Sequence, residues 1–163
     1  MNVFVDSNVI VYAHDRKDPA KRERAQSLLE KHALDGSLTL STQVLQESYN
    51  VLVRRSLMEP SRALFAVEKL AASRVVGSNA AFVLDAVRLS QRFELSAWDA
   101  LIVQAALAAG CVTLFTEDLQ AGQRFGDLEV VNPFNPVDPL ADAVHEPRAA
   151  YRNKAVTPAK RVR

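Results

Sequence analysis

The stretch Val3-Phe4-Val5-Asp6-Ser7-Asn8 decides the fold, because three apolar residues run directly into an aspartate at the start of the chain. A short continuous apolar run is typical of a strand that is buried on both faces of a parallel sheet. Ser7 and Asn8 are expected to cap a short helix that follows. Ligands of open α/β sheets bind outside the carboxyl ends of the strands, so Asp6 is expected at the site of chemistry.

Composition limits the classes of protein that fit. The chain has 163 residues, 48% of them hydrophobic, which is enough for one domain with a sizeable core. Its net charge of +1 makes no case for nucleic-acid binding by the chain as a whole, so any basic surface must be local. The single cysteine, Cys111, excludes an internal disulfide and suits a cytoplasmic protein. We expect no signal peptide and no membrane span, since no apolar run approaches ~20 residues.

Strand-like and helix-like patterns alternate along the chain. Further strands are expected at residues 38–40, 75–76, 112–115 and 128–131, and longer helices at 19–33, 43–55, 60–70, 80–93 and 97–109. This alternation predicts an α/β domain of parallel βαβ units over residues 1–135. Residues 136–163 carry several prolines and a basic end. They are expected to be a disordered tail or an arm that binds RNA or a partner.

The expected helix 97–109 is apolar around almost its whole circumference, as buried helices are. Asp99 is therefore out of place, because a buried ionised carboxylate is costly without a cation or donors to offset it. The alternative is structural: Ser96 and Asp99 have the spacing of a capping box. Both interpretations can hold together, since the helix N-terminus would then face the site.

Two further acidic positions have alternative interpretations. Glu47 borders the apolar face of its expected helix, but it could also be an ordinary, partly exposed helix residue. Glu117 and Asp118 directly follow the fourth expected strand, at the same edge of the sheet as Asp6. Asp118 could instead be the N-cap of a helix.

Together, the acidic residues indicate a metal site more strongly than any of them does alone. Asp6 and Asp118 follow strands, and Glu47 and Asp99 lie in early turns of helices that begin near the same edge. Carboxylates a few ångströms apart resist joint ionisation unless a cation lies among them. Oxygen ligands of this kind suit Mg²⁺ or Mn²⁺.

At this point the sequence resembles the PIN-domain ribonucleases, and among them the VapC-type toxins of bacterial toxin–antitoxin pairs. The matching stretches are residues 4–13, 41–50, 96–102, 113–120 and 131–134. The resemblance covers roughly residues 1–135 and does not extend to the tail. It implies a three-layer α/β/α fold with strand order 3-2-1-4-5, Mg²⁺-dependent hydrolysis of RNA, a homodimer and an antitoxin that covers the site.

The resemblance also implies roles for individual residues. The catalytic and metal-binding acids of the family correspond to Asp6, Glu47, Asp99 and Asp118, and its supporting polar residues to Asn8 and Thr116. Asp118 is preferred to Glu117 because it completes a Thr-x-Asp pattern with Thr116.

The sequence also suggests two basic residues for substrate binding and leaves two alternative functions open. Arg54 and Arg55 could contact RNA phosphates, or they could only complement the end of their helix. One competing function is a catalytically inactive binding module whose acids cap helices. The other is a phosphotransfer domain of the receiver or dehalogenase type. However, Asp6-Ser7-Asn8 lacks the second aspartate of the dehalogenase type, and no lysine follows the fourth or fifth expected strand.

Overall fold

The computed structural model describes residues 1–135, so the predicted tail 136–163 lies outside the described residues. The strands are β1 (Val3–Val5), β2 (Leu38–Ser41), β3 (Arg74–Val76), β4 (Thr113–Phe115), β5 (Arg124–Phe125) and β6 (Leu128–Val131). The helices are α1 (Ser7–Tyr12), α2 (Pro19–Leu34), α3 (Thr42–Arg54), α4 (Pro60–Ala71), α5 (Ala80–Phe93) and α6 (Ala97–Ala108). The predicted alternation of strands and helices is confirmed.

The sheet has the strand order β3-β2-β1-β4-β6-β5. Its first five strands in this order are parallel neighbours, so the predicted order 3-2-1-4-5 is confirmed when β6 is counted as the fifth strand. Strand β5, which pairs antiparallel with β6, was not predicted from the sequence. Gly126, with a φ of 63°, lies in the turn of this hairpin. The ring centroids of Phe125 and of Phe93 in α5 lie 5.0 Å apart. Two residues are too few to show a strand period.

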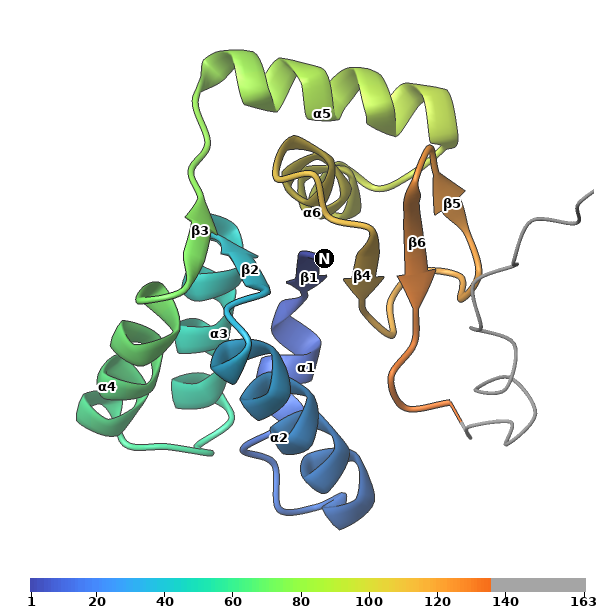
Figure 1. The fold of residues 1–163 in the computed structure, drawn as a ribbon. Coiled ribbons are helices and arrows are strands. Elements are labelled where there is room, and N and C mark those ends of the chain that lie inside the picture. The colour runs from blue at the N-terminus through green and yellow to red at the C-terminus, as the bar shows by residue number, and fades with distance from the viewer. Residues whose placement is uncertain (136–163) are drawn as a thin grey trace, which may run out of the picture.

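Helices cover both faces of the sheet. In Figure 1, α5 and α6 lie on one side of the strands, and α1 to α4 gather on the other. The central strand β1 is fully enclosed, with Phe4 and Val5 at 0% exposure. Helix α6 buries five of its residues, as its apolar circumference predicts. The three-layer α/β/α architecture is therefore confirmed.

The strand register brings three chain segments to one edge. Val5 of β1 is paired with Phe115 of β4, and Phe115 with Val131 of β6. Backbone bonds extend these pairs by one residue, because the Asp6 amide donates to the Phe115 carbonyl over 3.0 Å. Asp6 and Thr116 thus leave neighbouring strands side by side, at the carboxyl edge where ligands of such sheets bind.

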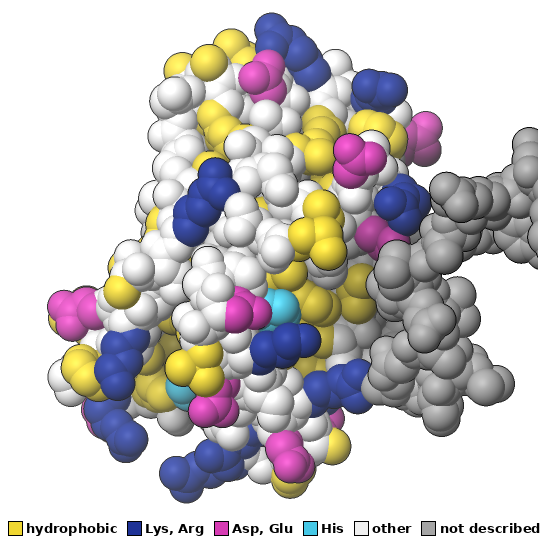
Figure 2. Space-filling view, in the orientation of Figure 1, with side chains coloured by type: hydrophobic (Ala, Val, Ile, Leu, Met, Phe, Trp, Pro, Cys, Tyr) yellow, Lys and Arg dark blue, Asp and Glu magenta, His cyan; other side chains and the backbone are white. Residues whose placement is uncertain are grey.

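The surface carries both signs of charge. Figure 2 shows acidic and basic side chains interspersed on the face it presents, in keeping with the small net charge. Within residues 1–135, no helix combines the length and apolarity that crossing a membrane requires.

Candidate active site

Asp6 is the buried centre of a polar cluster at the carboxyl edge. It caps α1, and its Oδ1 accepts a 2.6 Å hydrogen bond from the Ser7 amide. The helix therefore begins one residue earlier than the predicted Ser7-Asn8 cap. The Asp6 Oδ2 accepts from the Thr116 hydroxyl at 2.8 Å and from the Asn8 side-chain amide at 3.2 Å. Only 7% of Asp6 is exposed, so these donors replace the water that the carboxylate would otherwise bind.

Asn8 and Thr116 connect Asp6 with Asp118. The Asn8 Nδ2 donates to Asp118 Oδ2 over 3.0 Å as well as to Asp6, and it lies 2.9 Å from the Thr116 Oγ1. The Thr116 Oγ1 also accepts from the Asp118 backbone amide at 3.1 Å. Two carboxylates that come from different strand ends therefore share one amide donor. The Asn8 Oδ1 is buried and has no hydrogen-bond partner in the described part of the chain.

Glu47 reaches the same cluster from α3. The Ser7 hydroxyl donates to its Oε2 over 3.0 Å, and the Gln43 amide donates to its Oε1 over 3.1 Å. The Ser41 hydroxyl accepts from the Val44 amide at 3.3 Å and caps the helix that carries Glu47. No role in the site was predicted for Ser7 or Gln43 from the sequence. The signals available were the adjacency of Ser7 to Asp6 and the i, i+4 spacing of Gln43 and Glu47.

The pKa of Asp6 reflects this setting. Burial is the largest cause that raises it, from 3.8 to about 6. The hydrogen bonds from Thr116 and Ser7 lower the pKa, and the negative charges of Asp118 and Glu47 raise it further. Asp118 and Glu47 are therefore close enough to Asp6 for their charges to affect its ionisation.

Asp99 lies at the start of α6 and is held by the predicted capping interaction. The Ser96 hydroxyl accepts from the Asp99 amide at 3.1 Å and donates to Asp99 Oδ2 over 2.7 Å. A link to the cluster runs through its neighbour, because the Trp98 carbonyl lies 3.5 Å from the Gln43 Nε2. The structure thus connects Asp6, Asp118 and Glu47 through their donors. Asp99 is half-buried rather than buried, its side chain bonds to Ser96, and its link to these three runs only through the Trp98 carbonyl and Gln43.

Glu117 is engaged elsewhere. It forms a 2.6 Å salt bridge with Lys21, whose Nζ also donates to the Tyr12 hydroxyl over 3.0 Å. The hydrogen bond to Glu117 is the main cause that raises the Lys21 pKa. The alternative interpretation of Asp118 as a helix N-cap is wrong, because the chain bends after β4 without forming a helix.

Arg54 and Arg55 lie at the end of α3, opposite to its capped start. Both are exposed, and Arg54 is the last residue of the helix while Arg55 is its C-cap. At 1.5 Å per residue, Arg54 lies about 10 Å along the helix axis from Glu47. They are not part of the hydrogen-bonded cluster around Asp6.

The residues of this cluster fit a hard divalent cation in their chemistry. Carboxylate and amide oxygens are the ligands that Mg²⁺ and Mn²⁺ prefer, and the unpartnered Asn8 Oδ1 is one more such oxygen. The negative charges of Asp118 and Glu47 disfavour ionisation of Asp6, and a bound cation would offset this repulsion. In the arrangement of residues 1–135, however, no three acidic, histidine or cysteine side chains stand as close together as the ligands of one ion.

A sheet of mainly parallel strands covered by helices on both faces, with Asp6 following β1 at its carboxyl edge, defines an α/β domain. The chain belongs to the PIN domain family, whose model matches residues 3–125. No curated protein matches it.

Several solved structures share the fold. Mycobacterium tuberculosis VapC20, described as a sarcin-ricin loop cleaving toxin, is 22% identical with a TM-score of 0.59, over 72% of this chain and 92% of that one. A toxin–antitoxin complex from Klebsiella pneumoniae is 19% identical with a TM-score of 0.61, over 82% and 98%. VapBC2 from Rickettsia felis, bound to a DNA fragment from its promoter, is 19% identical with a TM-score of 0.57, over 80% and 97%.

Proposed function

We propose that this protein is a divalent-metal-dependent endoribonuclease that hydrolyses RNA phosphodiester bonds and acts as the toxin of a toxin–antitoxin pair. The observation that carries the proposal is the buried Asp6, whose pKa is raised to about 6 beside Asp118 and Glu47. Perturbed carboxyl groups of this kind concentrate at functional sites. Membership of the PIN family and the toxins among the solved structures with this fold support the same activity.

In this mechanism, the carboxylates of Asp6, Asp118, Glu47 and Asp99 would hold Mg²⁺ or Mn²⁺. The ion, when bound, lowers the pKa of its water ligand and stabilises negative charge on the scissile phosphate. Asn8 and Thr116 fix the orientation of the Asp6 and Asp118 carboxylates through the hydrogen bonds described above. Ser7 and Gln43 orient Glu47 in the same way. Arg54 and Arg55 remain proposed phosphate contacts at the far end of α3.

An experiment on matched variants tests the activity. RNA 5′ ends are sequenced after expression of the wild type, Asp6→Asn, Asp118→Asn and Asp127→Asn. Asp127 is an exposed hairpin residue outside the cluster, so its variant controls for the loss of one charge. New 5′ ends should appear with the wild type and Asp127→Asn only. Equal cleavage by all four proteins would reject the site.

A second candidate function is a catalytically inactive binding module. One observation favours it: within residues 1–135, no three Asp, Glu, His or Cys side chains lie close enough together to bind one metal ion. Titration with Mn²⁺ separates the two functions. The nuclease should bind Mn²⁺ in a manner that depends on Asp6 and Asp118, whereas the inactive module should not. The PIN match argues against the receiver and dehalogenase alternatives.

We also propose two protein partners, a second copy of this chain and an antitoxin. Two groups of large apolar side chains are exposed, one on α4 (Leu64 and Phe65) and one on α5 (Val83, Leu84 and Val87). Exposed apolar surface of this kind suits contacts with a second copy and with an antitoxin, and solved structures that share this fold include toxin–antitoxin complexes. Light scattering coupled to size exclusion tests the homodimer, which a monomer at micromolar concentration would contradict. The cytoplasmic location stays a prediction.

A further inference from the structure

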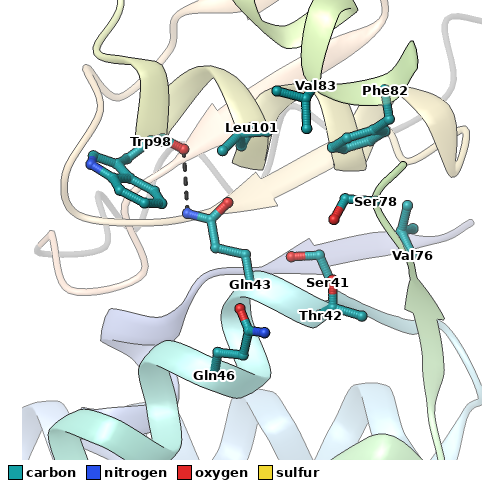
Figure 3. Close-up of a pocket in the computed structure, with 10 residues that line it drawn as sticks. All are labelled: Ser41, Thr42, Gln43, Gln46, Val76, Ser78, Phe82, Val83, Trp98 and Leu101. Atoms are coloured by element: carbon teal, nitrogen blue, oxygen red, sulfur yellow. Dashed lines mark hydrogen bonds between the residues drawn. The ribbon is translucent and has the colours of Figure 1, made fainter. Parts of the chain in front are cut away.

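A hollow of about 170 Å³ lies between the start of α3 and the helix pair α5–α6 (Figure 3). Figure 3 shows the α3 side chains on one wall and those of α5 and α6 facing them. Two lining residues are linked to the acidic residues: Gln43 bonds to Glu47, and Trp98 directly precedes Asp99. Pockets that hold drug-sized ligands measure roughly 300–1,000 Å³, so this hollow suits a single flat ring rather than a cofactor.

The lining combines an aromatic surface with amide groups. Trp98 is 67% exposed, although large aromatic side chains usually bury most of their surface. Phe82, Val83 and Leu101 provide further apolar surface, and Gln46 is an exposed amide on the facing wall. A nucleobase has the matching shape and chemistry, with two apolar faces and a polar edge that forms hydrogen bonds.

One lining residue, Gln43, connects the hollow with the acidic cluster. The Gln43 Nε2 donates to Glu47 Oε1 over 3.1 Å and lies 3.5 Å from the Trp98 carbonyl. Trp98 also directly precedes Asp99 in the first turn of α6. A nucleotide whose phosphate meets the carboxylates could therefore place a neighbouring base in the hollow without leaving the surface.

We propose that this hollow binds one unpaired base of the RNA substrate next to the cleaved bond, with Trp98 as the stacking surface and Gln46 as a group that reads the edge of the base. The proposal rests on the proposed nuclease function and requires an unpaired base, because a base within a duplex cannot enter the hollow. Stacking on aromatic side chains is the usual way in which proteins bind unpaired bases.

The chain supplies its own probe, since Trp98 is its only tryptophan. The metal-free protein in EDTA, which prevents cleavage, is titrated with a 5′-labelled single-stranded RNA and with an abasic ribose-phosphate oligomer of equal length. Label anisotropy measures binding, and tryptophan emission measures contact at the hollow. RNA should quench the emission, and the abasic oligomer should bind about 5- to 150-fold more weakly without quenching it. Unchanged emission at RNA saturation would overturn the proposal.

Variants separate stacking from other roles of Trp98. Trp98→Ala should weaken RNA binding about 5- to 150-fold, and Trp98→Phe should restore most of the affinity because it retains an aromatic face. Both variants should bind Mn²⁺ like the wild type, since the Trp98 side chain is not among the proposed ligands. Gln46→Leu should change the preference among the four bases at one position of the substrate, with Asn50→Leu, four residues further along α3, as the matched control.

The outcomes distinguish this proposal from the proposed function. If the wild type cleaves RNA with Mn²⁺ and Trp98→Ala binds and cleaves equally well, the base site is wrong and the nuclease stands. If no RNA is cleaved but the emission responds to bases, the nuclease fails and the base site stands. If Trp98→Ala changes the oligomeric state while RNA affinity stays constant, the hollow is a contact between copies and the proposal is overturned.

Discussion

The raised pKa of Asp6 should make the stability of the folded protein depend on pH. A carboxyl group whose pKa is higher in the folded than in the unfolded protein favours folding while it is protonated. Below pH 3.8 the group is protonated in both states, and this contribution is fully present. As the pH rises towards about 6, the unfolded chain ionises first and the contribution is lost. The metal-free protein therefore loses stability through this window because of Asp6.

The size of the loss in unfolding free energy follows from the shift in the Asp6 pKa. A rise from 3.8 to about 6 corresponds to about 3 kcal/mol at 1.36 kcal/mol per pKa unit. Because only 7% of Asp6 is exposed, solvent screens this effect little. Asp6→Asn removes the titrating group, so the difference in unfolding free energy between the variant and the wild type should grow by about 3 kcal/mol in favour of the variant from pH 3 to pH 7.

Urea unfolding in EDTA, followed at half-unit pH steps, measures this difference directly. The comparison between two proteins cancels the titration of all groups that they share. Asp127→Asn serves as the control and should differ from the wild type by a constant amount. A difference between Asp6→Asn and the wild type that stays flat within about 0.5 kcal/mol would show that Asp6 is not a strained, buried carboxylate, because ordinary surface changes are of that size.

Three further predictions concern the metal and the donors. Mn²⁺ at 100 times its dissociation constant should stabilise the wild type by about 2.7 kcal/mol in thermal unfolding. Below pH 6, the Mn²⁺ affinity measured by calorimetry should fall about tenfold per pH unit, because protons compete with the ion at Asp6. An affinity that does not change with pH would exclude Asp6 as a ligand. Asn8→Leu should destabilise the EDTA-treated protein by about 1–3 kcal/mol in urea, because two carboxylates lose a shared donor; unchanged stability would count against that network. Lys21→Met breaks a partly exposed salt bridge to Glu117, so it should cost no more than about 1 kcal/mol and leave Mn²⁺ affinity unchanged. A strengthened affinity would bring Glu117 back as a ligand, because the loss of Lys21 frees its carboxylate.

The sequence was sufficient to predict that Asp6 and Asp118 follow neighbouring strands at one edge of the sheet. Parallel strands end together, so apolar runs followed by Asp6 and by Thr116-Glu117-Asp118 define neighbouring positions before any coordinates exist. The apolar circumference of α6 likewise predicted a buried helix with a capping pair at its start. These features follow from local patterns that the rest of the chain does not override.

The finer geometry was beyond the sequence. The contact between Ser7 and Glu47 joins residues 40 positions apart and depends on how the short helix α1 packs against α3. The exposure of Trp98 was also unforeseen, because an aromatic residue in an apolar helix is more often buried. Strand β5 escaped notice because it consists of two residues held by a turn and one aromatic contact.

The most direct test is the position of a bound ion. Crystals of the wild-type protein grown with Mn²⁺ would show it by anomalous diffraction, with Asp6→Asn as the control. We predict a peak bonded to the carboxylates of both Asp6 and Asp118 in the wild type and none in the variant. Saturating Mn²⁺ without a peak at these residues, or a peak elsewhere that persists in Asp6→Asn, would contradict the proposed metal site.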